Sequence, residues 1–257
     1  MLPGIHRRSE WRLVERLLAG PDGAVARLTL WCDPRRLEAP DLTLFEALLP
    51  QMATSIRQAL LDREAREDRL TGTAVRRVLE KRLFDAFRRA VDEGRSLAVV
   101  MVDVDRFKRI NDRHGHAAGD RALAAVAAVL TLHKRQQDLL ARYGGEEFTL
   151  LVEDADGAAA LAIAERLRRA VEEIDFEVDG TTLALTVSAG VAAFPELHVK
   201  TPSELLLLAD GALYEAKNRG RNRCLLDLGR ARYRGPDGEA VTSDEASAEP
   251  PPPRIFA

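Results

Sequence analysis

The chain has 257 residues, of which 46% are hydrophobic and 31% are charged, and its formal net charge is −3. This composition supports one sizeable domain with an accessory segment and excludes disorder throughout. It gives no general attraction to nucleic acid or anionic lipid, so any phosphate binding must come from a local site. Because no apolar run approaches the roughly 18 residues that span a bilayer, we expect a soluble, cytoplasmic protein with neither nucleic acid nor membrane as a partner.

Residues 1–67 form the first of three predicted regions. A strand is predicted at 24–31 and a long helix at 42–66, because the apolar residues of the helix follow a three–four spacing. This helix either packs within its own domain or joins a second copy of the chain. The segment 28–60 resembles the end of a GAF sensory domain, but it is too short to be a complete one.

The middle region, 68–228, alternates helical and strand-like patterns. The expected helices have apolar residues at helical spacing, and the expected strands are continuous or alternating apolar runs. Their order predicts an α+β domain with helices packed on a mainly antiparallel central sheet. We expect helices near 75–91, 123–130, 161–174 and 202–218, and strands near 97–102, 139–143, 148–152, 183–194 and 223–228.

The last region, 229–257, combines a Gly-Pro-Asp-Gly turn, acidic and small residues, and a run of prolines. Its apolar content is too low to form a core of its own. We therefore predict a disordered tail.

Two acidic segments indicate a candidate metal site. Asp103 and Asp105 follow the predicted buried strand directly, and Glu146 and Glu147 follow a Gly-Gly pair in a predicted tight hairpin. If this hairpin neighbours the strand, the carboxylates converge, and hard oxygen ligands suit Mg²⁺. The spacing alone leaves open a solvated acidic turn.

Residues 144–148, Gly-Gly-Glu-Glu-Phe, resemble the GGDEF signature of the diguanylate cyclase family, in its GGEEF form. Other family motifs follow at the expected spacing, and together they cover 68–228. One departure is Val75, which stands where the family usually has Asn. The further motifs are Asp-Arg-Leu-Thr-Gly at 68–72, Asp-Val-Asp-Arg-Phe-Lys at 103–108, Ile-Asn-Asp at 110–112, Gly-His-Ala-Ala-Gly-Asp at 115–120, Ser-Ala-Gly-Val at 188–191 and Gly-Arg-Asn at 220–222.

The resemblance implies a GGDEF domain with a ferredoxin-like, palm-type sheet. It also implies an enzyme that condenses two GTP molecules into cyclic di-GMP and releases two pyrophosphates. It implies two Mg²⁺ ions in each half-site, with Mn²⁺ as a possible substitute. The implied metal ligands are Asp103, the carbonyl of Val104, Glu146 and Glu147. Glu146 is also the implied base, and Lys108 is the implied catalytic cation.

The resemblance also implies a set of substrate contacts. The carboxylate of Asp120 would read the N1–H and 2-amino group of guanine, which favours GTP over ATP and a symmetric product. From the residues alone, Asn111 could cap a turn, His116 could be structural, and cations at a helix C-terminus are favourable anyway. The implied substrate contacts are Phe107, Lys108, Asn111, His116, Asp120, Gly145, Lys217 and Arg221.

Residues 135–138, Arg-Gln-Gln-Asp, resemble the RxxD product-inhibition site of the family. Arg135 and Asp138 would bind cyclic di-GMP through a guanidinium fork and a carboxylate, and Arg166 stands where relatives supply a second arginine. The alternative is an ion pair at a helix end.

Each domain would hold one GTP, so the implied reaction needs a homodimer, and the long helix before Asp68 is the expected means of forming it. Two other classes of protein are open to the sequence. One is a non-catalytic receptor for cyclic di-GMP or GTP, which usually has a degenerate signature loop. The other is a polymerase or adenylyl cyclase with a palm domain, which the Gly-Gly hairpin and the pair Asn111 and Asp120 disfavour.

Overall fold

The computed structural model describes residues 12–20, 23–32, 39–64 and 66–242, and the chain divides into two compact units, 1–65 and 66–257. In the first unit, β1 (Arg12–Gly20) pairs antiparallel with β2 (Gly23–Cys32), and α1 (Ala39–Glu64) follows. The predicted strand at 24–31 and helix at 42–66 correspond to β2 and α1. Strand β1 was not predicted.

In the described part of the second unit, eight strands form one sheet. They are β3 (Ala74–Val75), β4 (Leu97–Val104), β5 (Leu139–Arg142), β6 (Glu147–Glu153), β9 (Val187–Phe194), β10 (Cys224–Asp227), β11 (Arg232–Arg234) and β12 (Ala240–Thr242). Their order in space is β12-β11-β10-β9-β4-β6-β5-β3. The central strands β9, β4, β6 and β5 are antiparallel, whereas β10 runs parallel to β9 and β3 runs parallel to β5. The described sheet is therefore mixed, but five of its seven strand pairs are antiparallel, so the predicted mainly antiparallel sheet is confirmed.

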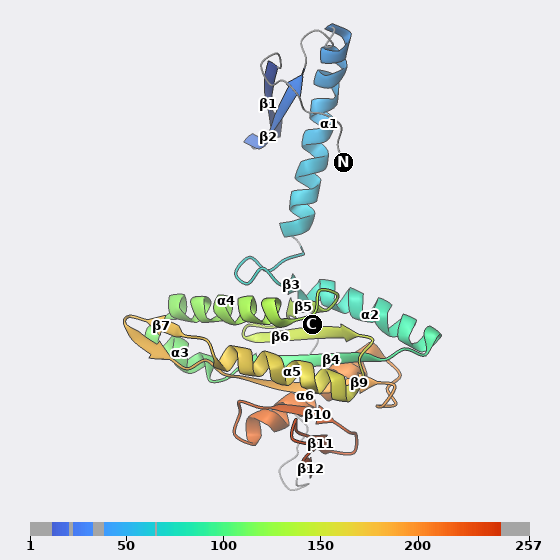
Figure 1. Cartoon of the computed structure of the whole chain (residues 1–257), viewed down its shortest axis with the longest axis vertical. Coiled ribbons are helices and arrows are strands. Elements are labelled where there is room, and N and C mark those ends of the chain that lie inside the picture. The colour runs from blue at the N-terminus through green and yellow to red at the C-terminus, as the bar shows by residue number, and fades with distance from the viewer. Residues whose placement is uncertain (1–11, 21–22, 33–38, 65, 243–257) are drawn as a thin grey trace, which may run out of the picture. The chain divides into compact units, whose positions relative to one another are not determined.

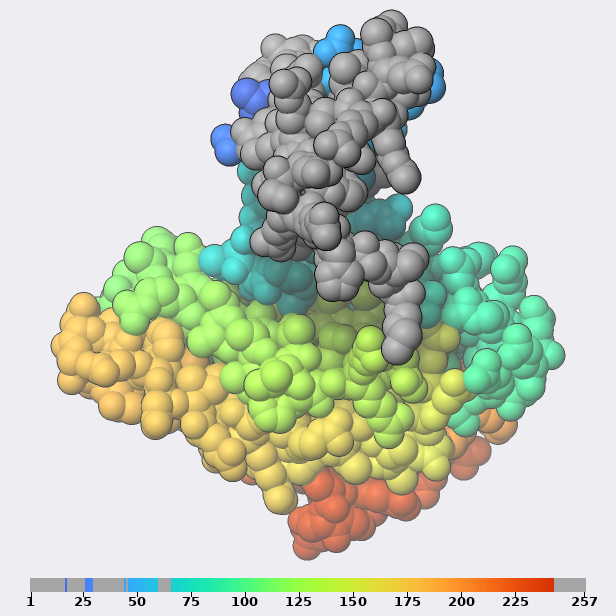
Figure 2. Space-filling view, turned by 45° about the horizontal axis from the view of Figure 1, so that its top comes forward, coloured from blue at the N-terminus to red at the C-terminus, as the bar shows by residue number. Residues whose placement is uncertain are grey.

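Helices cover both faces of this sheet (Figure 1). They are α2 (Arg76–Glu93), α3 (Phe107–His114), α4 (His116–His133), α5 (Gly157–Glu172) and α6 (Pro202–Asn218). Core residues of α4 and α5 pack on one face, and those of α2 and α6 pack on the other. A small hairpin of β7 (Phe176–Val178) and β8 (Thr181–Leu183) lies at the end of the unit beside α3 and α4 (Figure 1), and Figure 2 shows this region at the edge of the surface. Within the described ranges, no helix has both the length and the apolar character of a membrane span.

Every residue of β4 is buried, because helices lie over both faces of the strand. Side chains alternate between the faces of a strand, so Val100 and Val102 belong to the core under α4 and α5, while Val99 and Met101 belong to the core under α2 and α6. The same alternation places Asp103 on the α2–α6 face. The alternation along this continuous buried strand thus determines the face of the sheet on which Asp103 lies.

The predicted disorder from residue 229 is wrong for the part that the structure describes. β11 pairs antiparallel with β10 and β12 pairs with β11, so the chain extends the sheet. Tyr233 and Val241 pack against Ala212, Ala216 and Leu225. The low apolar content correctly indicates that this segment forms no core of its own. It folds because the edge of β10 offers backbone hydrogen bonds and the side of α6 offers a surface against which two apolar side chains pack. Residues 243–257 lie outside the described residues.

Candidate active site

The acidic end of β4 lies directly beside the Gly-Gly hairpin. In the register of β4 and β6, Asp103 is the partner of Glu147. Next to this pair, the N–H of Val104 donates a hydrogen bond to the carbonyl oxygen of Glu146 at 3.2 Å. Directly opposite residues of an antiparallel pair point to the same face. The Gly-Gly hairpin is therefore a neighbour of the buried strand, which is the arrangement that the predicted metal site requires.

The hairpin is tight because two consecutive N–H groups on its first side share one carbonyl oxygen on its second side. The N–H groups of Tyr143 and Gly144 donate to the carbonyl of Glu147 at 2.8 and 3.2 Å. A Cβ added at Gly144 would overlap the carboxylate of Glu147, whereas one added at Gly145 would meet open space. The first glycine thus makes room for an acidic side chain, and the second leaves the outside of the turn accessible.

Asp103 is buried, with 4% of its surface exposed, and Nζ of Lys217 on α6 lies 2.7 Å from its Oδ2. Burial raises the pKa of Asp103 to about 6, although the hydrogen bond and charge of Lys217 lower it, and the charges of Glu146 and Glu147 raise it further. At Asp103, the lowering effect of Lys217 on the pKa is therefore smaller than the raising effect of burial and the neighbouring carboxylates.

Within the described residues, no group of three or more His, Cys, Asp or Glu side chains is placed so that it could hold a metal ion. Lys217 is the cation that faces Asp103. The donor chemistry nevertheless suits a hard divalent cation, because Asp103 and Glu147 bring carboxylate groups to one strand end. The side chains at this strand end therefore have the chemistry that such an ion requires.

Asp105 has a different role from the one that its position in the acidic segment indicates. Its carboxylate is buried and accepts hydrogen bonds from Thr186 Oγ1 at 2.8 Å, Ser188 Oγ at 2.7 Å and the N–H of Asn222 at 3.0 Å. These donors come from β9, the segment before it, and the loop after α6. Asp105 therefore joins three segments around the site, and its oxygens are already engaged.

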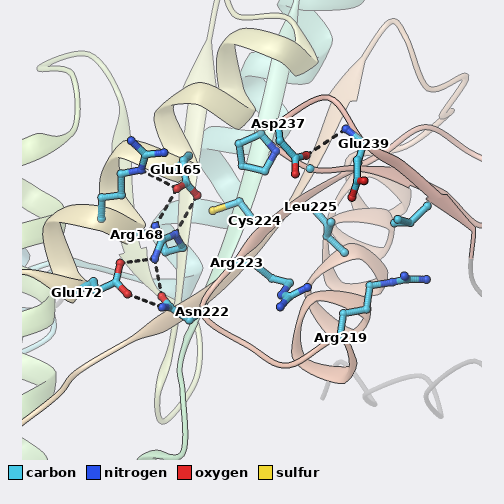
Figure 3. Close-up of a pocket in the computed structure, with 14 residues that line it drawn as sticks. Glu165, Arg168, Glu172, Arg219, Asn222, Arg223, Cys224, Leu225, Asp237 and Glu239 are labelled. Carbon is cyan, nitrogen blue, oxygen red and sulfur yellow. Dashed lines mark hydrogen bonds and ion pairs between the residues drawn. The ribbon is translucent and has the colours of Figure 1, made fainter.

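The loop after α6 is held from its other side by α5. Arg168 donates to Asn222 Oδ1 at 2.6 Å and to Glu172 at 2.8 Å, and Asn222 Nδ2 donates to Glu172 at 2.6 Å. Arg168 is 9% exposed and also binds Glu165 (Figure 3). Because Asn222 and its neighbour Arg221 have positive φ values of 47° and 68°, this loop needs such anchoring. Sequence reasoning did not identify this network.

The predicted base-reading residues lie at the contact between α3 and α4. Asn111 Oδ1 is buried and has no hydrogen-bond partner among the described residues. It fits only because Gly119 has no side chain, since a Cβ there would overlap this oxygen. The next residue, Asp120, is exposed, as is His116 at the start of α4. A buried unpaired acceptor next to an exposed carboxylate is suited to a ligand that donates N–H groups.

The predicted phosphate contacts surround the start of α3, which follows β4 after a short turn. Phe107 is buried, Lys108 is exposed, and the helix begins without a side-chain cap. N–H groups at a helix N-terminus favour anions. Lys217 pairs with Asp103, and Arg221 is exposed, with Nη1 3.4 Å from the carbonyl of Lys217.

The hairpin is also tied to the opening motif of the domain. Arg142 binds Asp68 through Nη1 at 3.0 Å and donates through Nη2 to the carbonyl of Gly145 at 2.7 Å. Asp68 in turn accepts from the N–H and the hydroxyl of Thr71 at 2.9 and 2.7 Å. Arg142 was not identified from the sequence, because its partner lies 74 residues away.

The predicted RxxD site forms a turn at residues 134–138, with Lys134 and Arg135 at its start and Asp138 at its end. Asp138 is buried, and its Oδ2 accepts from the backbone N–H of Arg135 at 3.1 Å. Burial raises the pKa of Asp138, while the hydrogen bond and charge of Arg135 and the charges of Lys134 and Arg166 lower it. Its Oδ1 is buried without a hydrogen-bond partner in the described region. The acid thus contacts the backbone of Arg135, and its second oxygen is available.

The family model for the diguanylate cyclase GGDEF domain matches residues 65–223. Diguanylate cyclase TpbB of Pseudomonas aeruginosa is 39% identical over 215 residues, which are 81% of this chain and 48% of TpbB. This chain therefore spans about half the length of that relative.

Two solved structures are similar to the chain. The coiled coil and GGDEF domain of DgcB from Caulobacter crescentus, in complex with c-di-GMP, has a TM-score of 0.67 and 27% identity, covering 74% of this chain and 100% of that one. The active GGEEF domain of a diguanylate cyclase from Vibrio cholerae has a TM-score of 0.56 and 32% identity, covering 59% and 96%. The fold, the site and these matches agree, and the chain belongs to the GGDEF diguanylate cyclase family.

Proposed function

We propose that the chain is a diguanylate cyclase, which joins two GTP molecules into cyclic di-GMP with release of two pyrophosphates. The observation that carries this proposal is the pairing of Asp103 with Glu147 across β4 and β6, directly before the start of α3. The relative TpbB is a diguanylate cyclase, and the similar domain from Vibrio cholerae, described as active, has the GGEEF signature that residues 144–148 also have.

Asp103, the carbonyl of Val104, Glu146 and Glu147 would hold the divalent ions, with Mg²⁺ as the first choice and Mn²⁺ as the substitute. When bound, such ions neutralise charge on the transferred phosphate and make the attacking hydroxyl more acidic. The 3′-hydroxyl of one GTP forms a bond to the α-phosphorus of the other, and the bond to pyrophosphate breaks. Glu146 accepts the proton of the hydroxyl.

The basic residues around the site would bind the phosphates. Lys108, Lys217 and Arg221 supply positive charge near the start of α3, and Phe107 and Lys108 supply backbone N–H groups. Phosphate binding gives Lys217 an alternative partner to Asp103, and the carboxylate then becomes available to a metal. Gly145 allows the close approach of the nucleotide to the hairpin.

Guanine would be read between α3 and α4. Asp120 and the buried, unpaired Oδ1 of Asn111 are acceptors, and guanine offers donors at N1 and its 2-amino group. Adenine has an acceptor at N1, so it would leave an acceptor of the protein unpaired. Leaving a buried polar group unpaired costs about 1–3 kcal/mol, which supports GTP as the substrate. His116 lies at the start of α4 and would contact the base or ribose.

Two half-sites must face each other, so the proposal includes a homodimer. Residues 1–67 would supply dimerisation and signalling through α1 and a GAF-like fragment, and 68–228 would be the catalytic domain. The similar DgcB structure contains a coiled coil together with its GGDEF domain, which supports this role for α1. The proposal places the reaction in the cytoplasm, where GTP is found.

Product inhibition is part of the proposal. Arg135, Asp138 and Arg166 would bind cyclic di-GMP away from the active site. The unpaired Oδ1 of Asp138 is an acceptor for a guanine N–H, and the two arginines supply guanidinium groups for phosphate. DgcB was solved in complex with c-di-GMP.

The experiment that tests the proposed function uses the purified full chain with Mg²⁺ and either GTP or ATP. We expect pyrophosphate and cyclic di-GMP from GTP, neither from ATP, and neither from an Asp103→Ala variant. Binding of cyclic di-GMP without any turnover of GTP would support a receptor instead. Full activity of Asp103→Ala would contradict the proposed site.

A further inference from the structure

One side of α3 has a row of arginines that the proposed active site does not use. Arg109 and Arg113 are four residues apart, so they lie on the same side of the helix. Asn111 is two residues from each, which is about 200° around the helix axis. The arginine side is therefore turned away from the side that faces Gly119 and α4.

This side of α3 lines a cavity of about 380 Å³. Its other walls come from the segment between β8 and β9 and from the loop after α6. The lining residues are Asp105, Arg106, Arg109, Ile110, Arg113, His114, Leu183, Ala184, Thr186, Gly220, Arg221 and Asn222. The cavity thus joins a row of cations to a short apolar wall and to the loop that carries Arg221.

The charges that line this cavity are unbalanced. Four arginines face one carboxylate, and that carboxylate, Asp105, already accepts three hydrogen bonds. Within the described residues, none of Arg106, Arg109, Arg113 and Arg221 forms an ion pair. The whole chain has a net charge of −3, so this local excess of positive charge opposes its overall balance.

A larger cavity on the same unit shows the contrasting arrangement. It measures about 740 Å³ and is lined by four arginines and four acidic residues. Figure 3 shows that its most buried arginine, Arg168, is surrounded by Glu165, Glu172 and Asn222. Arginine is common throughout this chain, but three of the four arginines here, Arg168, Arg169 and Arg219, form ion pairs with glutamates. The cavity beside α3 lacks such partners, and an anionic ligand would supply the missing charge.

We propose that the cavity beside α3 binds a diphosphate or polyphosphate anion. Guanidinium groups bind phosphate oxygens with pairs of hydrogen bonds, and two such groups one helical turn apart match two linked phosphates. Arg221 lines this cavity and also belongs to the proposed phosphate site of the substrate. The identification of the ligand as the pyrophosphate product rests on the proposed function, whereas anion binding itself does not.

The first test is calorimetric titration of the full chain with sodium pyrophosphate, without divalent ions. The variant Arg109→Ala/Arg113→Ala removes both cations from the middle of α3, and alanine maintains the helix. The matched control Arg88→Ala/Arg232→Ala removes two exposed arginines elsewhere. We expect the Kd of the first variant to rise about ten-fold or more and that of the control to change less than about two-fold. Equal weakening in both would overturn the proposal.

The second test separates this cavity from the substrate site. Lys217→Ala should reduce GTP turnover but leave pyrophosphate binding within about three-fold of the wild type. If Lys217→Ala abolished binding and Arg109→Ala/Arg113→Ala did not, pyrophosphate would occupy the substrate site and the proposal would be wrong. Titration with ADP shows whether the diphosphate is free or part of a nucleotide. Equal binding of ADP and pyrophosphate supports a free anion, and tighter binding of ADP supports the diphosphate group of a nucleotide.

A third measurement keeps this proposal independent of the cyclase assignment. The initial rate of cyclic di-GMP formation, with pyrophosphate removed by a pyrophosphatase, should be the same in wild type and Arg109→Ala/Arg113→Ala. Added pyrophosphate, with the pyrophosphatase omitted, should then slow the wild type more than the variant. A wild type without turnover would refute the proposed function alone, because the calorimetric comparison would still decide whether the cavity binds the anion.

Discussion

Nη1 of Arg142 lies 3.0 Å from Oδ1 of Asp68, and the same guanidinium donates to the carbonyl of Gly145. One side chain on β5 thus connects the start of the domain to the acidic hairpin. Both partners are largely buried, with 19% and 24% of their side chains exposed. The position of the hairpin relative to β4 therefore depends on a contact outside the signature sequence.

Replacing Arg142 by lysine should reduce the turnover of GTP about ten-fold or more. Lysine retains the charge but cannot make the forked contact with Asp68 and Gly145. Arg95→Ala is the control, because Arg95 also forms ion pairs but is half exposed and belongs to another loop. Steady-state kinetics with unchanged circular dichroism would support this role. Equal rates for Arg142→Lys and wild type would contradict it.

Removing the side chain of Arg168 should lower the stability of the protein and raise the KM for GTP. Arg168→Ala leaves Glu165 and Glu172 without a buried partner, so we expect the free energy of unfolding to fall by about 3 kcal/mol. The KM for GTP should also rise, because Asn222 holds the loop that carries Arg221. Arg169→Ala is a matched control, since Arg169 binds the same Glu165 but is 68% exposed; it should cost less than about 1 kcal/mol. Urea unfolding and kinetics measure the two effects.

The same network predicts a pH dependence of stability. Burial tends to raise the pKa of Glu165, but hydrogen bonds from Arg168 and Arg169 hold it below its ordinary value of 4.5. The pKa of Glu172 is lowered mainly by the hydrogen bond from Arg168. Carboxylates with lowered pKa values add stability that is fully present above pH 4.5 and is lost as the pH falls through their folded values.

We therefore expect the difference in unfolding free energy between wild type and Arg168→Ala to shrink as the pH falls below 4.5. Urea unfolding of both proteins across this range measures it. A difference that grew with acidity would show that the carboxylates do not carry the effect.

Gly119 and Gly211 are two helical glycines with different surroundings. A Cβ at Gly119 would overlap Asn111 Oδ1, whereas one at Gly211 would lie 4.0 Å from its nearest neighbour, the hydroxyl of Tyr233. Gly119→Ala should raise the KM for GTP about ten-fold or more, because Asn111 must move. Gly211→Ala should leave KM unchanged and increase the stability by up to about 1 kcal/mol, through helix propensity. The same KM in both variants would show that Asn111 does not contact the base of GTP.

Product inhibition should depend on Arg135 and Arg166. In Arg135→Ala and in Arg166→Ala, we expect added cyclic di-GMP to slow the reaction much less than in wild type, at unchanged initial rates. Asp138→Ala should also lose thermal stability, because Asp138 holds the turn through the N–H of Arg135. Inhibition curves for the three variants measure this, and wild-type inhibition in Arg135→Ala would reject the site.

Local patterns in the sequence predicted most of the second unit. Each of these patterns depends only on residues within one segment of the chain. The apolar run at 97–102 predicted β4, and the Thr201 cap with Pro202 predicted the start of α6. The eight-residue α3 was missed because two turns are too short to show a periodic pattern. The predicted strand at 183–194 is interrupted before β9.

The sequence by itself determined the family and the order of the central elements, because motif spacing records them directly, and it predicted the acidic and base-reading residues. Only the tertiary structure decided what Asp105, Arg142 and Arg168 contact. Each of them has a partner that lies 54–117 residues away in the chain, and no local periodicity encodes such distances. The unbalanced charge beside α3 likewise exists only because three separate segments close one cavity.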